Sequence, residues 1–262
     1  MSKQIWFTFI ISLLSVILVF FILAPIVKLV TGSSTELIME TVKDREVYNS
    51  ILLTFKASLV ATLFSLLLGV PLAYLLARAE FPGKSIIEGI INLPVIIPHT
   101  AAGIALLTVF GNRFFLGKFF NIFGISFVGK FAGIVIAMMF VSVPFLISET
   151  VEGFRSIDVR LEKVARTLGA SPAGAFFRIA LPLNKGHILS GSMMMWARGL
   201  SEFGAVVILA YHPMIAPVLI YERFTSFGLK YSRPVAALMV IASLVIFIIM
   251  RFINTKSMET GE

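Results

Sequence analysis

The chain has 262 residues, of which 58% are hydrophobic and 14% are charged, with a formal net charge of +8 and a mean hydropathy of +0.97. Soluble domains carry about 25% charged residues, so this composition excludes an ordinary soluble domain and predicts an all-α integral membrane protein. Without cysteine, disulfides, thiol catalysis and cysteine-ligated metals are excluded. The basic excess is typical of residues flanking membrane spans and does not indicate nucleic-acid binding.

Long apolar stretches predict six membrane-spanning helices in a single transmembrane domain that covers residues 1–262. We expect the spans at about 5–30, 48–77, 85–109, 131–150, 186–211 and 234–252. The first is much longer than the apolar core of about 7–15 residues found in signal peptides, so we expect it to remain in the protein. An even number of spans places both termini on one side of the membrane.

The distribution of charge indicates which side that is. Basic residues crowd into the loop 151–185 between the fourth and fifth spans: Arg155, Arg160, Lys163, Arg166, Arg178 and Lys185. Loops rich in Lys and Arg stay in the cytoplasm. We therefore expect this loop and both termini to be cytoplasmic, in a plasma or inner membrane. The polar segment 31–47 and the basic connector 110–130 are then expected on the outer side.

The third span carries two prolines, Pro94 and Pro98, and the second is followed by His99 and Thr100. Proline removes a backbone donor and disturbs the carbonyl four residues before it. Groups freed in this way are tolerated at membrane depth only inside protein or beside a wet cavity. The kink has two explanations that we weigh equally, a pathway-lining helix or packing alone. For His99 we prefer the packing role.

The basic loop is predicted to begin with a short amphipathic helix. Its apolar stripe consists of residues at helical spacing, namely Leu161, Val164, Ala165 and Leu168. Either Ser156 or Asp158 supplies an oxygen that can cap the helix start. An amphipathic loop of this kind lies on lipid headgroups or docks into a groove of a soluble partner, and these physical arguments leave both possibilities open.

The second half of the loop is predicted to be another short helix. Gly169 ends the first helix, and Ser171 with Pro172 starts the second as its cap and first residue. We expect Pro182 to stop it. The result is a pair of helices bent at Gly169 outside the membrane.

The fifth span has a small-residue face and one pair of opposite charges. Small residues recur four apart, at Ala197, Ser201 and Ala205, and allow another helix to approach closely. Arg198 and Glu202 are also four apart and can meet on a neighbouring face. Charges within a span suggest a functional site, but we prefer a mutually neutralising structural pair, since a free Arg would hold an anion too tightly for release.

The spacing from Ala165 through Gly169 to Ile179 and Pro182 resembles the inner-loop signature of permease subunits of binding-protein-dependent ABC importers of type I. The full signature begins with Glu-Ala-Ala, whereas this chain has a lysine first and carries Glu162 one position earlier, so a specific glutamate contact is in doubt. By this resemblance the loop couples to an ATP-hydrolysing subunit. The coupling residues would be Glu162, Lys163, Ala165, Arg166, Thr167, Leu168, Gly169, Ala170, Ser171 and Pro172.

Two further stretches, 92–107 and 197–205, resemble the third and fifth spans of molybdate, tungstate and sulfate permeases, and 98–103 is most similar to the archaeal-type molybdate/tungstate permeases. The resemblance implies an oxyanion path formed with a second copy of the chain. It also implies two cytoplasmic ATP-binding subunits that hold ATP and Mg, and an extracellular or periplasmic oxyanion-binding protein. Tentative path residues are Pro94, Pro98, His99, Thr100 and Glu202. A sulfate importer is the nearest alternative.

Two other classes fit the sequence less well. A membrane enzyme would need a nucleophile with a base or a metal-ligand motif, and no catalytic, cofactor-binding or metal site is expected here. The phosphate-binding motif G-x-x-x-x-G-K-[ST] does not occur, so ATP would be hydrolysed by a partner. A secondary transporter driven by ions would need more carboxylates inside its spans than Glu202, or an internal inverted repeat.

Overall fold

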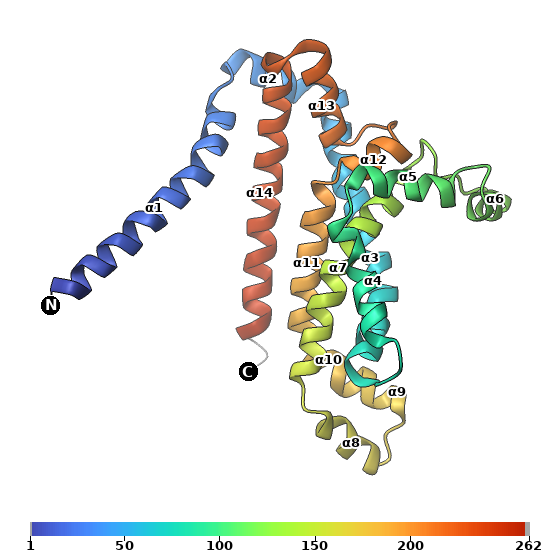
Figure 1. The fold of residues 1–262 in the computed structure, drawn as a ribbon. Helices are drawn as coiled ribbons and strands as arrows, with labels where there is room; N and C mark the ends of the chain where they lie inside the picture. Colours follow the sequence, from blue (N-terminus) through green and yellow to red (C-terminus); the bar gives the residue numbers. More distant parts are fainter. Residues whose placement is uncertain (1, 260–262) are drawn as a thin grey trace.

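The computed structural model describes residues 2–259 of the chain and the side-chain surroundings of residues 4–249. Every regular element in this part is helical, which confirms the predicted all-α class (Figure 1). The helices are α1 (Ser2–Thr31), α2 (Thr35–Lys43), α3 (Arg45–Arg78), α4 (Lys84–Ile96), α5 (His99–Phe110), α6 (Phe115–Ile122), α7 (Phe131–Ser156), α8 (Val159–Thr167), α9 (Pro172–Ala175), a π-helical segment (Phe176–Ala180), α10 (Leu181–Leu183), α11 (Lys185–Leu200), α12 (Gly204–Leu209), α13 (Ala216–Phe227) and α14 (Leu229–Glu259).

The long apolar helices are α1, α3, α7 and α14, each of which is able to cross a membrane by length and composition. The predicted third span, 85–109, is instead two helices, α4 and α5, bent by 115°. The break lies at Pro98, because the residue before a proline avoids helical geometry and Ile97 is extended, with ψ 146°. Pro94 stays inside α4 without ending it.

The predicted fifth span, 186–211, is also interrupted, so the structure does not confirm the count of six membrane-spanning helices. Helix α11 ends at Leu200 and α12 begins at Gly204. Glycines on both sides of the gap, Gly199 and Gly204, weaken the helix. The carboxylate of Glu202 then accepts a hydrogen bond from the backbone N–H of Ala205 at 2.8 Å, which starts the new helix.

Segments expected to be loops contain additional helices. The polar segment 31–47 holds the amphipathic helix α2, capped by Ser34, and the second span starts early because Asp44 caps α3 at Glu46. The connector 110–130 holds α6, and the segment before the last span holds α13. Helix α7 continues to Ser156, six residues into the predicted loop 151–185. Capping residues account for α2 and for the early start of α3, whereas α6 and α13 begin without a side-chain cap.

The core lies where α3, α7 and α11 pack together. Small buried residues of α3, such as Ala57 and Ala61, allow this close approach. At the contact of α3 with α11, the hydroxyl of Ser58 donates to the carbonyl oxygen of Trp196 at 2.8 Å. A side chain at Gly199 would collide with Ser58. These three helices form the central body to which the shorter helices attach.

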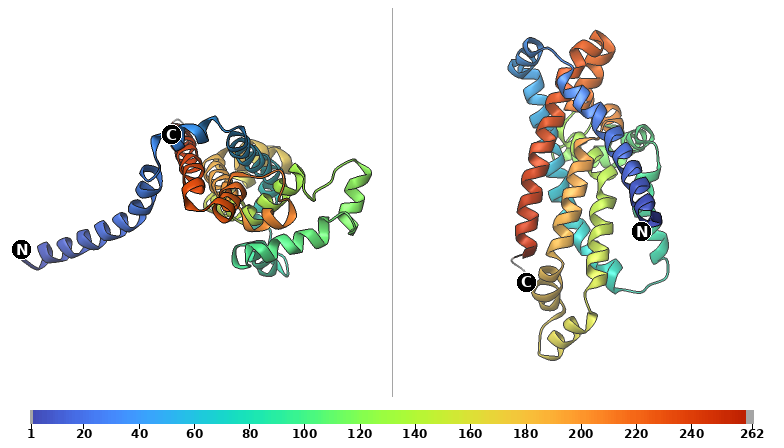
Figure 2. Two further views of the ribbon diagram at one scale, coloured as in Figure 1. Left: turned by 90° about the horizontal axis from the view of Figure 1, so that it is seen from above. Right: turned by 90° about the vertical axis from the view of Figure 1, so that its left-hand side faces the viewer.

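Figure 1 shows α8 at one end of the body and α2 with α13 at the other, here called the α8 end and the α13 end. Helix α1 leaves the α13 end and runs away from the body, as Figure 1 and the left view of Figure 2 show. None of its most apolar window is buried. At its base, Arg233 donates to the carbonyl oxygen of Gly32 at 2.6 Å.

Candidate functional site

Helix α8 is held at its start by Asp158, one of the two residues expected to cap it. The Asp158 carboxylate accepts a hydrogen bond from the backbone N–H of Arg160 at 2.8 Å. Ser156 belongs to α7 instead, where its hydroxyl donates to the carbonyl oxygen of Gly153. A two-residue corner, Ile157 and Asp158, therefore separates the long helix α7 from the short helix α8.

The predicted bend is present at Gly169, which has φ +94° and no atoms crowding the place of a side chain. The N–H of Ala170 bonds to the carbonyl of Ala165 at 3.0 Å, and the N–H of Gly169 bonds to that of Arg166 at 3.1 Å. This pair of bonds is the helix-ending pattern that favours glycine at the left-handed position. Ser171 then accepts from the N–H of Gly174, as expected for the cap of α9.

The prediction that Pro182 stops the second helix is wrong. The chain continues from α9 through the π-helical segment into α10, which contains Pro182, and after a turn at Asn184 into α11. A wider π turn placed before the proline changes the bonding pattern at the point where the N–H is missing. The basic loop is therefore joined to α11 by nearly continuous helix.

The two faces of α8 differ in their surroundings. The predicted apolar stripe lies on the surface: Leu161 and Val164 are exposed, and Leu168 at the tip is 83% exposed. Lys163 and Arg166 are also exposed. Glu162 is the exception on this helix, with only 6% exposed. The exposed stripe is free to contact another molecule, while Glu162 is turned toward the body.

Glu162 binds two residues near the end of α3. Its Oε1 accepts from Nε of Arg78 at 2.8 Å, and its Oε2 accepts from the hydroxyl of Tyr74. Arg78 also donates to the carbonyl oxygen of Ile157 at 3.1 Å, at the corner between α7 and α8. The ring of Tyr74 packs edge-on against Phe154 and Phe176. This Glu162 tie connects α8 directly to α3.

The tie was not foreseen from the sequence. In the sequence, Arg78 is recognisable only as a basic residue at the end of the second span, and no motif identifies Tyr74. The displaced position of Glu162 relative to the family signature was the one available signal. Its meaning depends on a contact between residues more than eighty positions apart, which only the fold reveals.

A second charged cluster joins the two broken spans. Nη2 of Arg198 lies 3.0 Å from Oε2 of Glu202 and 2.7 Å from Nδ1 of His99. His99 Nδ1 is also 2.9 Å from the same carboxylate oxygen. Glu202 is fully buried, whereas His99 is partly exposed. The start of α5 and the gap between α11 and α12 thus share one charge-balanced contact, called here the elbow cluster.

The other tentative path residues take different positions. Pro94 is buried, Pro98 and Thr100 are exposed, and Glu202 has no surface of its own. Any contact of Glu202 with a passing solute would have to act through Arg198 or His99.

The predicted packing face on the fifth span is not one helix face, because the break at residues 201–203 separates its members. Ser201 lies in that gap and is exposed, and Ala197 is partly exposed on α11. Ala205 on α12 is fully buried and packs on α5. A side chain at Gly103 would come within 2.9 Å of the carbonyl oxygen of Ala205. Close packing therefore occurs between α5 and α12, next to the two helix breaks, rather than along a whole span.

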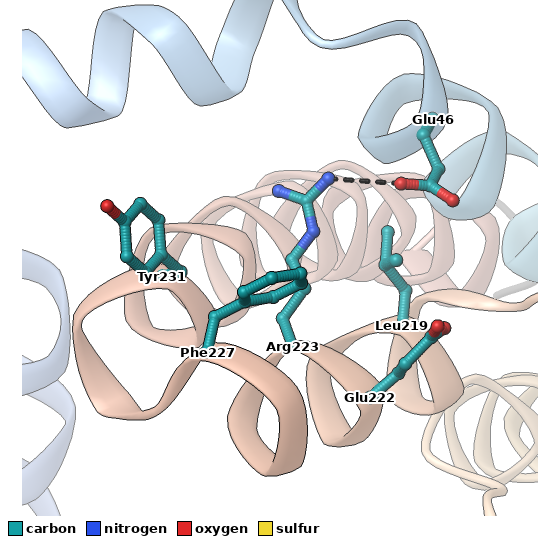
Figure 3. A pocket seen from close by; sticks show the side chains of 6 residues that line it. All are labelled: Glu46, Leu219, Glu222, Arg223, Phe227 and Tyr231. Carbon is teal, nitrogen blue, oxygen red and sulfur yellow. Dashed lines mark hydrogen bonds and ion pairs between the residues drawn. The ribbon is translucent and has the colours of Figure 1, made fainter.

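The α13 end holds a crevice of about 440 Å3, shown in Figure 3, that is lined by Glu46, Leu219, Glu222, Arg223, Phe227 and Tyr231. Arg223 reaches across it to Oε2 of Glu46 at 3.2 Å and to Oδ2 of Asp44 at 2.6 Å. Burial opposes the charge of both partners, yet the hydrogen bond from Arg223 lowers the pKa of Asp44 and the two carboxylates raise the pKa of Arg223. These ion pairs fix α13 to the start of α3.

Comparison with known proteins shows which family the chain resembles in sequence. Residues 65–257 match the family model described as binding-protein-dependent transport system inner membrane component. The molybdate/tungstate transport system permease protein WtpB of Thermococcus kodakarensis is 43% identical over 242 residues, covering 92% of this chain and 93% of the relative. The protein of the same name from Methanocaldococcus jannaschii is 39% identical, covering 90% and 92%. The sulfate transport system permease protein CysT of Synechococcus elongatus is 33% identical, covering 79% and 77%.

Solved structures agree on the fold. A subunit of a bacterial ABC transporter involved in the import of the acidic polysaccharide alginate superposes with a TM-score of 0.76 at 17% identity, covering 97% of this chain and 96% of that one. The resemblance stated from the loop and span motifs is thereby confirmed. The chain is a multi-pass membrane protein that belongs to the family of binding-protein-dependent transport system inner membrane components.

Proposed function

We propose that the chain is the membrane-spanning subunit of an ATP-driven importer that conducts molybdate or tungstate, delivered by a soluble binding protein. The observation that carries this is the 43% identity, over nine-tenths of both chains, to a molybdate/tungstate permease. The sulfate permease is a more distant relative at 33% identity, so sulfate import is the second candidate. All three anions are tetrahedral and doubly charged, and we expect the binding protein to make most of the selection.

A second copy of the chain would complete the path. Helix α1 is apolar on all sides, and none of its most apolar window is buried against its own chain. Lipid can cover such a helix, but its separation from the body in Figure 2 is better explained if it reaches across to another copy. Two copies would then enclose the path between them, with the elbow cluster of each on the inner side. Pro98, His99 and Thr100 would lie along that path, whereas Pro94 is buried within its own chain.

Coupling would take place at the α8 end. The exposed stripe of Leu161, Val164 and Leu168 offers an apolar surface on a helix that projects beyond the membrane-spanning body (Figure 1). The basic residues around it favour a cytoplasmic position for this end and for both termini. Each copy would dock there on one ATP-binding subunit, which holds ATP and Mg. Residues 163–172 would form the contact. Glu162 would hold α8 in position through its bonds to Tyr74 and Arg78 of α3.

The function is tested by uptake into proteoliposomes that contain the chain, the ATP-binding subunits, ATP inside and the binding protein outside. We expect tungstate or molybdate to accumulate only when both ATP and the binding protein are present. Sulfate should accumulate much more slowly. Uptake driven by an ion gradient without ATP would contradict the proposal, and faster uptake of sulfate would favour the second candidate.

The bend at Gly169 should be required for coupling. A valine there must adopt a left-handed backbone, which costs about 1–2 kcal/mol, so the tip of α8 should shift in the Gly169→Val variant. We expect assembly of the complex to persist while binding-protein-stimulated ATP hydrolysis falls.

Gly83→Val is the matched control, because Gly83 has a similar φ of +87° and equally open surroundings but lies in the turn before α4. An equal loss of stimulation in both variants would remove the special role of Gly169.

The Glu162 tie should hold α8 against the body. Removing one partner of a buried ion pair costs about 3–5 kcal/mol, so Glu162→Ala should free α8 and speed tryptic cleavage after Arg160, Lys163 or Arg166.

Glu80→Ala is the control, since the carboxylate of Glu80 pairs with Lys84 on the surface with 87% of its side chain exposed. The rate of loop cleavage should be unchanged in this control. A cleavage rate in Glu162→Ala equal to that of the unaltered chain would show that the tie does not hold the helix.

A further inference from the structure

Helix α7 has an unusual exposed surface for a membrane span. It is the most buried of the long helices, with 56% of its most apolar window inside the protein. After its first residue, Phe131, its exposed residues are all polar and lie in its last third: Ser148, Glu152, Arg155 and Ser156. A face in contact with lipid would be expected to show leucine, isoleucine or phenylalanine there, as α1 does.

The neighbouring helices extend this polar surface. Arg155 binds Oε1 of Glu88 on α4 at 2.7 Å and Oε1 of Glu152 at 3.0 Å. A crevice of about 180 Å3 between α4 and α7 is lined by Asn92 and Ser148 among others. Next to these residues on α7, Glu149 binds Nδ1 of His187 on α11 at 2.9 Å. We call Glu88, Asn92, Ser148, Glu149, Glu152 and Arg155 the polar strip.

Helix α4 separates two environments on its two sides. Glu88 and Asn92 lie one turn apart on the side facing α7. Ile86, Ile90 and Leu93 lie on the opposite side and are exposed, as expected for contact with lipid. The strip is therefore not a general property of this end of the molecule but of one face.

The strip also reaches deeper than the headgroup layer. Asn92 is seven residues inside the predicted third span, 85–109, which is about 10 Å at 1.5 Å per residue, and Glu149 lies inside the predicted fourth span, 131–150. The interfacial layer is only about 5–8 Å thick on each side of the hydrocarbon core. Charged groups at membrane depth face the interior of the assembly or a water-filled cavity rather than lipid.

From these observations we infer that the polar strip lines a water-filled vestibule, through which the oxyanion leaves at the α8 end of the path. This rests on the proposed function, in which a second copy supplies the opposite wall. The charge of the polar strip is suited to release of an anion rather than to binding it. Arg155, the arginine of the strip, is already paired with Glu88 and Glu152, so the strip itself offers a doubly negative anion no free arginine and does not retain it.

Because the chain has no cysteine, single cysteines report directly on water access. The variants are Asn92→Cys and Ser148→Cys in the strip, with Leu93→Cys and Ile90→Cys on the opposite side of α4 as depth-matched controls. Each is assembled with the ATP-binding subunits in proteoliposomes and treated, without nucleotide, with membrane-impermeant methanethiosulfonates that reach the α8 end.

We expect both strip positions to react about tenfold faster or more than both controls, because only a thiol reached by water forms the reactive thiolate. The ratio of the rate with the cationic trimethylammonium-ethyl reagent to the rate with the anionic sulfonato-ethyl reagent should also be higher in the strip than for a free thiol such as mercaptoethanol, which corrects for the intrinsic reactivity of the two reagents. Ser148→Cys is nearly isosteric, so it keeps the test valid if Asn92→Cys fails to assemble.

Equal reactivity of strip and control positions would overturn the vestibule, and a ratio of cationic to anionic rates below that of the free thiol would overturn its role as an exit. These failures are distinguishable from failure of the proposed function. Unreactive strip cysteines in a complex that still takes up tungstate refute only the vestibule. Reactive strip cysteines in a complex that imports no oxyanion refute the proposed function and leave the water-filled cavity in place.

Discussion

A charge inside an apolar helical protein must be paired or must reach water, and this constraint determines where the functional parts of the molecule lie. Burying an unpaired ion is strongly unfavourable. The fully buried Glu202 is accordingly matched by Arg198 and His99, and Glu162 by Arg78 and Tyr74. The charges on α7 that are not buried gather on one face near the α8 end. Each of these groups joins two helices that are distant in sequence.

The broken spans follow from the same constraint. Backbone groups freed at a break need partners, and at membrane depth these come from protein or from enclosed water. The break at Pro98 and the break after Leu200 lie against each other, and the elbow cluster bridges them. Close packing of Gly103 on Ala205 brings α5 and α12 together beside it. Each interrupted span therefore stabilises the break in the other.

The sequence predicted the features that depend on local pattern. Hydropathy identified the membrane class and the long helices, the spacing around Gly169 identified the bend, and Ser171 with Pro172 identified the next helix start. Predictions failed where distant contacts decide the outcome. The start of α12 depends on a hydrogen bond to Glu202, and this carboxylate also binds His99, about a hundred residues earlier. Pro182 is accommodated by a π turn that no simple spacing rule predicts. The Tyr74 contact of Glu162 had no sequence signal.

The proposed coupling requires the tip of α8 to touch the ATP-hydrolysing subunit. A photoreactive benzophenone attached at Leu168→Cys, a position that is 83% exposed, measures this contact in the assembled complex. The same probe at Ile122→Cys on α6, which is 79% exposed and lies away from the α8 end in Figure 1, is the control. We expect illumination to join Leu168→Cys, and not Ile122→Cys, to the ATP-hydrolysing subunit. Adducts of Leu168→Cys with lipid alone would contradict the proposed coupling and would instead place this loop on the membrane surface.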